Sequence, residues 1–208
     1  MPTCYTSPMN IETLLSQIKF DLSAVKLEQL PFDDGYEVVF VGRSNSGKSS
    51  CLNTFTRKGM ANTSKTPGRT QQINVFSLDE TRRLIDMPGY GYAKVPPRIK
   101  KHWEALMDDY FRERRCLRGI FMIMDIRHPL KDFDIIMMEW AVASQIPLHI
   151  LLNKADKLTF SESSKTLLEV NKAIAPYAPH ITAQVFSAEK KTGLSVAYKV
   201  LKPWFGIN

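Results

Sequence analysis

Cysteine is scarce in this chain of 208 residues, which has three, at positions 4, 51 and 116. An odd, irregularly spaced set gives no metal-ligand spacing and indicates reduced thiols in a cytosolic protein. Internal repeats and low-complexity tracts are absent. No stretch approaches the roughly 18 to 20 apolar residues of a membrane span, and the N-terminus has no basic cluster followed by an apolar core, so no signal peptide is visible. These absences favour a cytoplasmic protein without a membrane span.

Basic residues exceed acidic ones, with 28 Lys and Arg against 21 Asp and Glu, a formal net charge of +7. Hydrophobic residues make up 44% of the chain, which is ordinary globular composition and enough for one core. We expect a monomer with a single domain over 1–208, in which 1–35 is an extension, a short helix and an extended segment, packed on the rest. The basic excess favours RNA as a partner, and the alternative is an ordinary basic surface.

Apolar runs alternate with helical patterns along most of the chain. The pattern predicts a short helix over 11–20, a weak strand or extended segment over 25–30, and then an α/β fold of three layers. That fold has a mostly parallel six-stranded sheet with helices on both faces, because near-continuous apolar strands separated by helices indicate a covered parallel sheet. The expected strands are 37–42, 72–78, 82–86, 119–125, 147–152 and 181–187, and the expected helices 48–57, 97–115, 131–144, 161–175, which a serine would cap, and 195–205.

The segment after the first of these six strands matches the phosphate-binding pattern G-x-x-x-x-G-K-[ST]. Backbone N–H groups that end at a helix N-terminus form an anion cradle. The lysine can reach the β- and γ-phosphates, and the following hydroxyl can bind Mg²⁺. The residues of this loop are Gly42, Arg43, Ser44, Asn45, Ser46, Gly47, Lys48 and Ser49.

A second candidate segment, Asp86-Met87-Pro88-Gly89, ends the strand over 82–86. The carboxylate can hold Mg²⁺ through water, and the N–H of Gly89 can approach a γ-phosphate. The alternative is a simple strand-ending turn. Its distance from the phosphate loop favours the functional interpretation.

Two segments at the ends of later strands point to guanine. Asn153-Lys154-Ala155-Asp156 follows a buried strand, and the carboxylate of Asp156 can accept both the N1–H and the N2–H₂ of guanine. Adenine lacks that pair of donors. Phe186, Ser187 and Ala188 end the last strand, where backbone N–H groups could bond to guanine O6.

A polar loop over 62–71 contains threonines that could close on Mg²⁺ when a γ-phosphate is present. Thr63, Thr66 and Thr70 are candidates, and Thr70 is preferred because it is next to the following strand. The nucleotide-binding residues expected here are Gly68, Arg69, Thr70, Gln71 and Gln72, and the alternative is an ordinary surface loop.

Four stretches carry a family resemblance: G-R-S-N-S-G-K-S-S, T-S-K-T-P-G-R-T-Q, D-M-P-G-Y-G-Y-A and M-D-I-R-H-P-L-K-D. From about residue 18 to 205 the chain resembles the EngB (YihA/YsxC) family of bacterial GTPases, within the TrmE-Era-EngA-EngB-Septin-like class. The resemblance implies a P-loop GTPase fold of the Ras-like type and a role in assembly of the large ribosomal subunit, linked to normal cell division and septation. It also implies Mg²⁺ bound by Ser49 and Thr70.

Hydrolysis of GTP depends on positioning and charge stabilisation, with water as the nucleophile. Many GTPases orient that water with a Gln directly after the Asp-x-x-Gly glycine, where this chain has Tyr90. In related GTPases an Asn at the position of Asn45 ligates K⁺. We therefore expect a slow GTPase with K⁺ as a candidate activator, and Lys48, Asn45, Thr70 and Gly89 as its catalytic residues. The alternative for Asn45 is a side chain that only braces the loop.

Residues 90–101 mix basic and aromatic side chains, with Trp103 close behind, and could dock on ribosomal RNA. The alternative is a helix with a solvated basic face and a buried Trp103. Asp125 to Pro129 is interpreted as a strand-to-helix turn rather than a catalytic Asp/His pair. Competing functions are a GTPase of tRNA modification, a nucleotide-dependent switch at the division site, and an enzyme that uses ATP.

Overall fold

The computed structural model describes residues 10–59, 72–90 and 97–207, with the backbone alone for 97–104. Its centre is one sheet in the strand order β1-β3-β4-β2-β5-β6-β7. Four strand pairs are parallel, and the pairs β1–β3 and β3–β4 are antiparallel. The strands are β1 Lys19–Ala24, β2 Tyr36–Gly42, β3 Ile73–Ser77, β4 Arg82–Asp86, β5 Leu117–Asp125, β6 Leu148–Asn153 and β7 Ile181–Val185.

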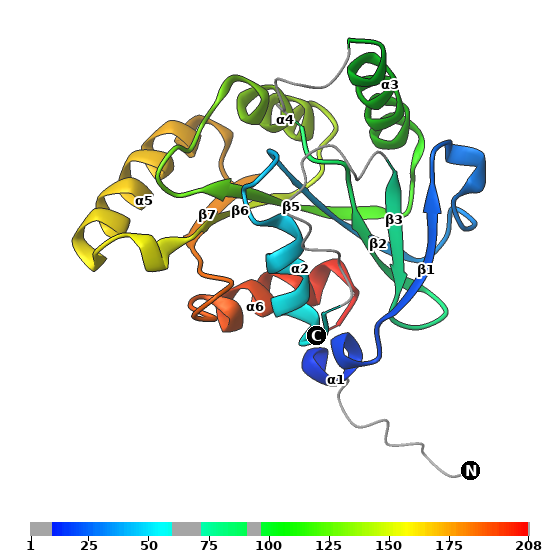
Figure 1. The fold of residues 1–208 in the computed structure, drawn as a ribbon, viewed down its shortest axis with the longest axis horizontal. Coiled ribbons are helices and arrows are strands. Elements are labelled where there is room, and N and C mark those ends of the chain that lie inside the picture. Colours follow the sequence, from blue (N-terminus) through cyan, green and yellow to red (C-terminus); the bar gives the residue numbers. More distant parts are fainter. Residues whose placement is uncertain (1–9, 60–71, 91–96, 208) are drawn as a thin grey trace.

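Helices cover both faces of the sheet, as the sequence predicted. Figure 1 shows α3 and α4 above the sheet and α1, α2 and α6 below it. Two separate hydrophobic cores match these two faces, and side chains of α5 join the core beneath α3 and α4. The helices are α1 Ile11–Ser16, α2 Lys48–Thr56, α3 Pro97–Glu113, α4 Asp132–Ala143, α5 Phe160–Ile174 and α6 Leu194–Trp204.

The central strands are apolar along nearly their whole length. In β2 the side chains of 38–41 are fully buried, and β6 is buried from end to end. Because parallel strands end together, the turns after β2, β4, β5, β6 and β7 meet at one edge of the sheet. All the candidate segments that the structure describes lie at this edge. Gln72 is among them, because β3 runs antiparallel to β4 and its Asn74 pairs with Asp86 at the end of β4.

The sheet has seven strands rather than the six predicted. The first helix ends at Ser16, and residues 19–24, partly assigned to that helix, form the edge strand β1 against β3. Val25–Leu30 is not a strand, and contains only a short 3₁₀ turn over Leu27–Gln29. The period-2 signal in β1 is weak, because among its side chains only Ala24 is buried.

The cap of α5 also differs from the prediction. Thr159 precedes the helix, and its hydroxyl accepts a hydrogen bond from the N–H of Glu162 at 3.3 Å. The carboxylate of Glu162 in turn accepts from the N–H of Thr159 at 2.8 Å. This reciprocal capping box stabilises the helix start two residues before the serine that we had predicted as the cap.

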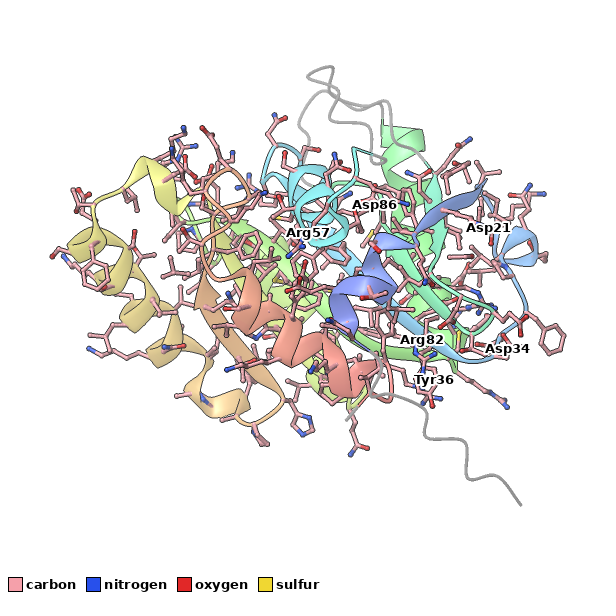
Figure 2. All side chains as sticks on the ribbon, turned by 90° about the horizontal axis from the view of Figure 1, so that it is seen from below. Asp21, Asp34, Tyr36, Arg57, Arg82 and Asp86 are labelled. Carbon is pink, nitrogen blue, oxygen red and sulfur yellow. The ribbon has the colours of Figure 1, made fainter. Side chains whose placement is uncertain are left out.

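A buried polar cluster lies at the opposite end of the sheet, where the parallel strands begin. Glu37 is fully buried, pairs with Arg114, and accepts a hydrogen bond from the hydroxyl of Tyr110 at 2.6 Å. Nearby, the guanidinium of Arg82 lies 5.5 Å from the ring centre of Tyr36, and Figure 2 labels both residues. In the described part of the chain, no helix is both long and apolar enough to cross a bilayer.

Candidate functional site

The turn from β2 to α2 places the predicted phosphate loop at the carboxyl edge of the sheet. Asn45 and Gly47 have φ of 67° and 95°, in the left-handed region. A Cβ on Gly47 would lie 2.3 Å from Nδ2 of Asn153, and a Cβ on Gly42 would lie 2.6 Å from the carbonyl oxygen of Ile123. Glycine is therefore required at both positions because other segments pack directly against the loop.

Several backbone N–H groups of the loop have no acceptor within the described residues. They belong to Asn45, Gly47, Lys48 and Ser49. The first N–H groups of a helix lack intrahelical partners, and they carry the positive end of the helix dipole. The loop and the start of α2 therefore provide the donors that an anion such as phosphate needs.

Lys48 and Asp86 form a buried ion pair between the start of α2 and the end of β4. Only 8% of Lys48 and 3% of Asp86 is exposed, and Figure 2 labels Asp86. Each charge offsets the cost of burying the other. The lysine predicted to face phosphate and the carboxylate predicted to face Mg²⁺ thus lie in direct contact.

The turn over 86–89 packs against the phosphate loop. The hydroxyl of Ser44 donates to the carbonyl oxygen of Gly89 at 3.3 Å. A Cβ on Gly89 would lie 3.1 Å from that hydroxyl and 3.3 Å from the Ser44 nitrogen. The backbone of Gly89 can approach the loop this closely because it has no side chain.

Tyr90, at the position where many GTPases have Gln, is 7% exposed. Its hydroxyl donates to Oδ1 of Asp134 at 2.8 Å. Burial raises the pKa of Tyr90 well above its ordinary value, and the adjacent carboxylate of Asp134 raises that pKa further. The phenol therefore stays protonated and bonded to α4 rather than available to a water molecule at the loop.

Asn153 connects the guanine segment to the phosphate loop. Its Nδ2 donates to the carbonyl oxygen of Ser46 at 2.9 Å. Its Oδ1 accepts from the N–H of Ala188 at 3.1 Å. One buried amide thus holds together three segments that are far apart in the sequence.

Asp156 is oriented by the side chain of Ser187, although the sequence suggested a role only for the backbone of that residue. The hydroxyl of Ser187 donates to Oδ1 of Asp156 at 2.6 Å, and Lys157 lies 3.0 Å from Oδ2. The hydrogen bond from Ser187 lowers the pKa of Asp156, and Lys157 adds to that effect. An ionised carboxylate is the acceptor that the two guanine donors require.

The N–H groups that were predicted to bond to guanine O6 already have partners. The N–H of Ser187 donates to Thr192 at 3.1 Å, and that of Ala188 donates to Asn153. Phe186 is fully buried in the core, and its carbonyl accepts from the N–H of Ala155 at 3.1 Å. Its part in the site is thus a backbone brace.

Asp125 joins the site, although the sequence suggested only a turn. Its Oδ2 lies 2.9 Å from Nζ of Lys154 and 2.6 Å from the guanidinium of Arg127. The Lys154 ammonium also donates to the carbonyl oxygen of Asn45. The available signal was the position of Asp125 at the carboxyl end of a buried strand, which is where the other site residues lie.

Several predicted site residues lie outside the described residues. They include the preferred Mg²⁺ ligand of the polar loop and most of the basic segment after Tyr90. Gln72 is described, and is an exposed residue just before β3. The predictions outside the described residues are Thr63, Thr66, Gly68, Arg69, Thr70, Gln71, residues 91–96 and the side chains of 97–104, including Trp103.

Comparisons with known proteins agree with this geometry. A family model described as 50S ribosome-binding GTPase matches residues 37–154. Two strains of Coxiella burnetii have a protein named as a probable GTP-binding protein EngB that is 54% identical over 190 residues, which cover 91% of this chain and 93% of the relative.

Solved structures show the same fold. A crystal structure of a probable GTP-binding protein EngB has a TM-score of 0.66 at 17% identity, and the match covers 82% of this chain and 98% of that one. Era in complex with MgGDPNP and nucleotides 1506–1542 of 16S ribosomal RNA has a TM-score of 0.63 at 20% identity, over 81% of this chain and 56% of that chain. The phosphate loop, the guanine segment and these matches together show that the chain is a GTPase of the EngB family of GTP-binding proteins.

Proposed function

We propose that this protein is a cytoplasmic, monomeric GTPase that turns over GTP slowly and acts in assembly of the large ribosomal subunit. Normal cell division and septation would depend on it. The observation that carries the nucleotide part is the bridge made by Asn153, which joins the phosphate loop to the guanine segment. That bridge fixes the distance between a phosphate site and a base site, as a guanine nucleotide requires.

The proposed residue roles combine the geometry of the described residues with the sequence motifs. The free N–H groups of the loop would bind the β-phosphate, and Lys48 would leave Asp86 to contact the β- and γ-phosphates. Asp156, held by Ser187, would accept the guanine N1–H and N2–H₂. The N–H of Gly89 would face the γ-phosphate, and residues 68–72, with Thr70 among them, would close over it. All of chain 1–208 would form one domain, with 1–35 attached through β1 on β3 and the contact of α1 with α2.

Mg²⁺ fits the oxygen atoms at this site. The hydroxyl of Ser49 lies in the first turn of α2, and the carboxylate of Asp86 ends β4. Mg²⁺ prefers oxygen ligands and keeps several waters, so one or two protein oxygens together with phosphates are enough. Ser49 and Thr70 would hold the ion directly, Asp86 would hold it through water, and the ion would neutralise charge that develops on the phosphates.

Slow turnover follows from the position of Tyr90. Because its hydroxyl is bonded to Asp134, it cannot orient the attacking water. The side chain of Asn45 is exposed at the loop, where an amide oxygen could ligate K⁺. K⁺ at that position would add the charge that a trans-acting arginine supplies in other GTPases.

The ribosomal role is supported by the family and by charge. The family model is described as 50S ribosome-binding GTPase, and the structurally similar Era was solved with a segment of 16S ribosomal RNA. A net charge of +7 favours a polyanionic partner. The proposed link to septation rests on the family resemblance alone.

Two experiments test these proposals. GDP should bind far more tightly than ADP to the purified protein, because ADP lacks the donors that Asp156 would accept. Equal affinities would contradict the guanine assignment. For the cellular role, depletion followed by sedimentation profiling should show accumulation of incomplete large subunits, and an unchanged particle profile would contradict it.

A further inference from the structure

Three hydrogen bonds fix Tyr90 in place. Its N–H donates to the carbonyl oxygen of Gly42 at 3.3 Å, and its own carbonyl accepts from the N–H of Ser44 at 2.8 Å. Its hydroxyl donates to Asp134 at 2.8 Å. The residue directly after the phosphate-facing Gly89 is thus attached to the phosphate loop by its backbone and to α4 by its side chain.

The acceptor on α4 is fixed as firmly as the donor. Oδ2 of Asp134 accepts from the N–H of Lys131 at 2.9 Å, which caps the first turn of the helix. Asp134 is 1% exposed, and its burial raises the pKa of its carboxyl. The rings of Phe133 and Tyr90 lie 6.0 Å apart, so the same turn also packs on the tyrosine. Movement of Tyr90 would therefore disturb the beginning of α4.

Asp134 also borders the phosphate loop. A cavity of about 210 Å³ lies between that loop and the end of β5, and Ser44, Asn45 and Asp134 are among the residues that line it. Gly89 and α4 are connected through one residue, Tyr90, whose hydroxyl bonds directly to Asp134.

We infer that Tyr90 is a positioning residue that fixes the turn at Gly89 to the first turn of α4, so that a γ-phosphate bound at Gly89 changes α4. This inference rests on the proposed contact between Gly89 and the γ-phosphate. A nucleotide can shift α4 only by as much as it binds one arrangement better than the other. α4 would then be one surface on which a partner detects the bound nucleotide.

The test measures affinities for GDP and for a non-hydrolysable GTP analogue in wild type and in Tyr90→Phe. The variant removes one hydroxyl and leaves the buried ring. GDP has no group that reaches Gly89, so we expect its affinity to stay near the wild-type value. Affinity for the analogue should fall about fivefold or more, which is the low end of ordinary coupling between sites.

Tyr110→Phe is a matched control. Tyr110 is also buried and also donates its hydroxyl to a buried carboxylate, that of Glu37, but at the opposite end of the sheet. Tyr110→Phe should lose stability as Tyr90→Phe does, but it should keep the wild-type ratio of the affinity for the analogue to the affinity for GDP. A change in that ratio as large as the one in Tyr90→Phe would overturn the inference.

Asp134→Asn provides a second variant if Tyr90→Phe fails to fold. Asp134→Asn should also lower the affinity for the analogue relative to the affinity for GDP. The double variant should lose no more of this relative affinity than the single variant with the larger loss, because both changes break the same link. Hydrogen exchange of residues 132–136 should differ between GDP and the analogue in wild type and lose that difference in the variants. An unchanged ratio in both single variants would overturn the inference alone, whereas wild type that binds no guanine nucleotide would overturn the proposed function as well.

Discussion

The ammonium of Lys154 lies 2.9 Å from Oδ2 of Asp125 and also donates to the carbonyl oxygen of Asn45. One lysine of the guanine segment thus holds the phosphate loop from the side, and a carboxylate at the end of β5 holds the lysine. Burial favours a raised pKa for Asp125, but hydrogen bonds from Arg127 and Lys154 outweigh burial and keep the pKa of this carboxyl well below its usual range. Asp125 therefore stays ionised and bound to both cations.

Asp125→Asn should weaken nucleotide binding, because a neutral amide holds the Lys154 ammonium less strongly. A charged hydrogen bond contributes about 1.5 to 3 kcal/mol, so we expect affinity for GDP to fall roughly tenfold. Calorimetric titration with GDP measures the change. Arg127→Gln is the control, since Arg127 contacts the same carboxylate but, among the described residues, makes no hydrogen bond or ion pair with the phosphate loop. If the control loses as much affinity as Asp125→Asn, the route through Lys154 is wrong.

Asn153→Ala should separate the phosphate site from the base site. The variant removes the donor to Ser46 and the acceptor for the Ala188 N–H, and leaves both groups unpaired in a buried place. Each such loss costs about 1 to 3 kcal/mol. We expect GDP affinity to fall by about thirtyfold or more, while the far-ultraviolet circular dichroism spectrum remains that of the wild type.

A control for Asn153→Ala is Asn74→Ala on β3, which removes an asparagine whose Oδ1 accepts from the exposed Ser23. It should leave GDP affinity unchanged. Binding of GDP by Asn153→Ala at wild-type strength would show that the bridge does not position the nucleotide.

Most of the fold was predictable because the central strands are buried on both faces. Runs such as 38–41 and 119–124 have no exposed face that would need polar side chains, so their apolar patterns are continuous and their ends are clear. The edge strand β1 was missed for the opposite reason. It covers little apolar surface, and its pairing with β3 depends on a contact about 50 residues away in the sequence.

The candidate site was predictable where a short motif fixes the backbone, as at Gly42, Gly47 and Asp156. Contacts between motifs were not, because the sequence does not show which side chains meet. The bond from Ser187 to Asp156 and the bond from Tyr90 to Asp134 join positions 31 and 44 residues apart. The sequence indicated that Tyr90 is unsuited to orient water, but the carboxylate that binds it became visible only in the fold.

Asn45→Ala should abolish stimulation of GTP turnover by K⁺. In the wild type we expect turnover in KCl to exceed turnover in NaCl at equal ionic strength, because the amide oxygen of Asn45 would ligate the larger ion beside the phosphates. The bond from Lys154 reaches the backbone carbonyl of Asn45, so the variant should keep the loop in place. Equal wild-type rates in the two salts, or an Asn45→Ala protein that is still stimulated, would contradict a potassium role.

His149 gives a prediction about stability and pH that is independent of the nucleotide. Its ring is buried between β6 and β7, with Nδ1 2.7 Å from the Thr182 hydroxyl and Nε2 2.9 Å from Oε1 of Gln184. Burial lowers the pKa of His149 to about 4, although the hydrogen bond to Gln184 opposes this. The unfolded chain has a histidine pKa near its ordinary value of about 6.5, so it takes up a proton in a range where the folded protein does not.

The direction of the change in stability with pH follows from the numbers of protons that the folded and unfolded states bind. Between about pH 6.5 and pH 4 the unfolded state binds more protons, so the contribution of His149 to stability is present above that window and is lost as pH falls through it. The loss should reach about 2 kcal/mol between pH 7.5 and pH 5. Urea unfolding at these two pH values should show it in wild type, and His149→Gln, which cannot take up a proton, should lack that part of the change. His180 is exposed, so His180→Gln is the control and should keep the wild-type difference in the free energy of unfolding between the two pH values. If His149→Gln shows that same difference, His149 is not its source.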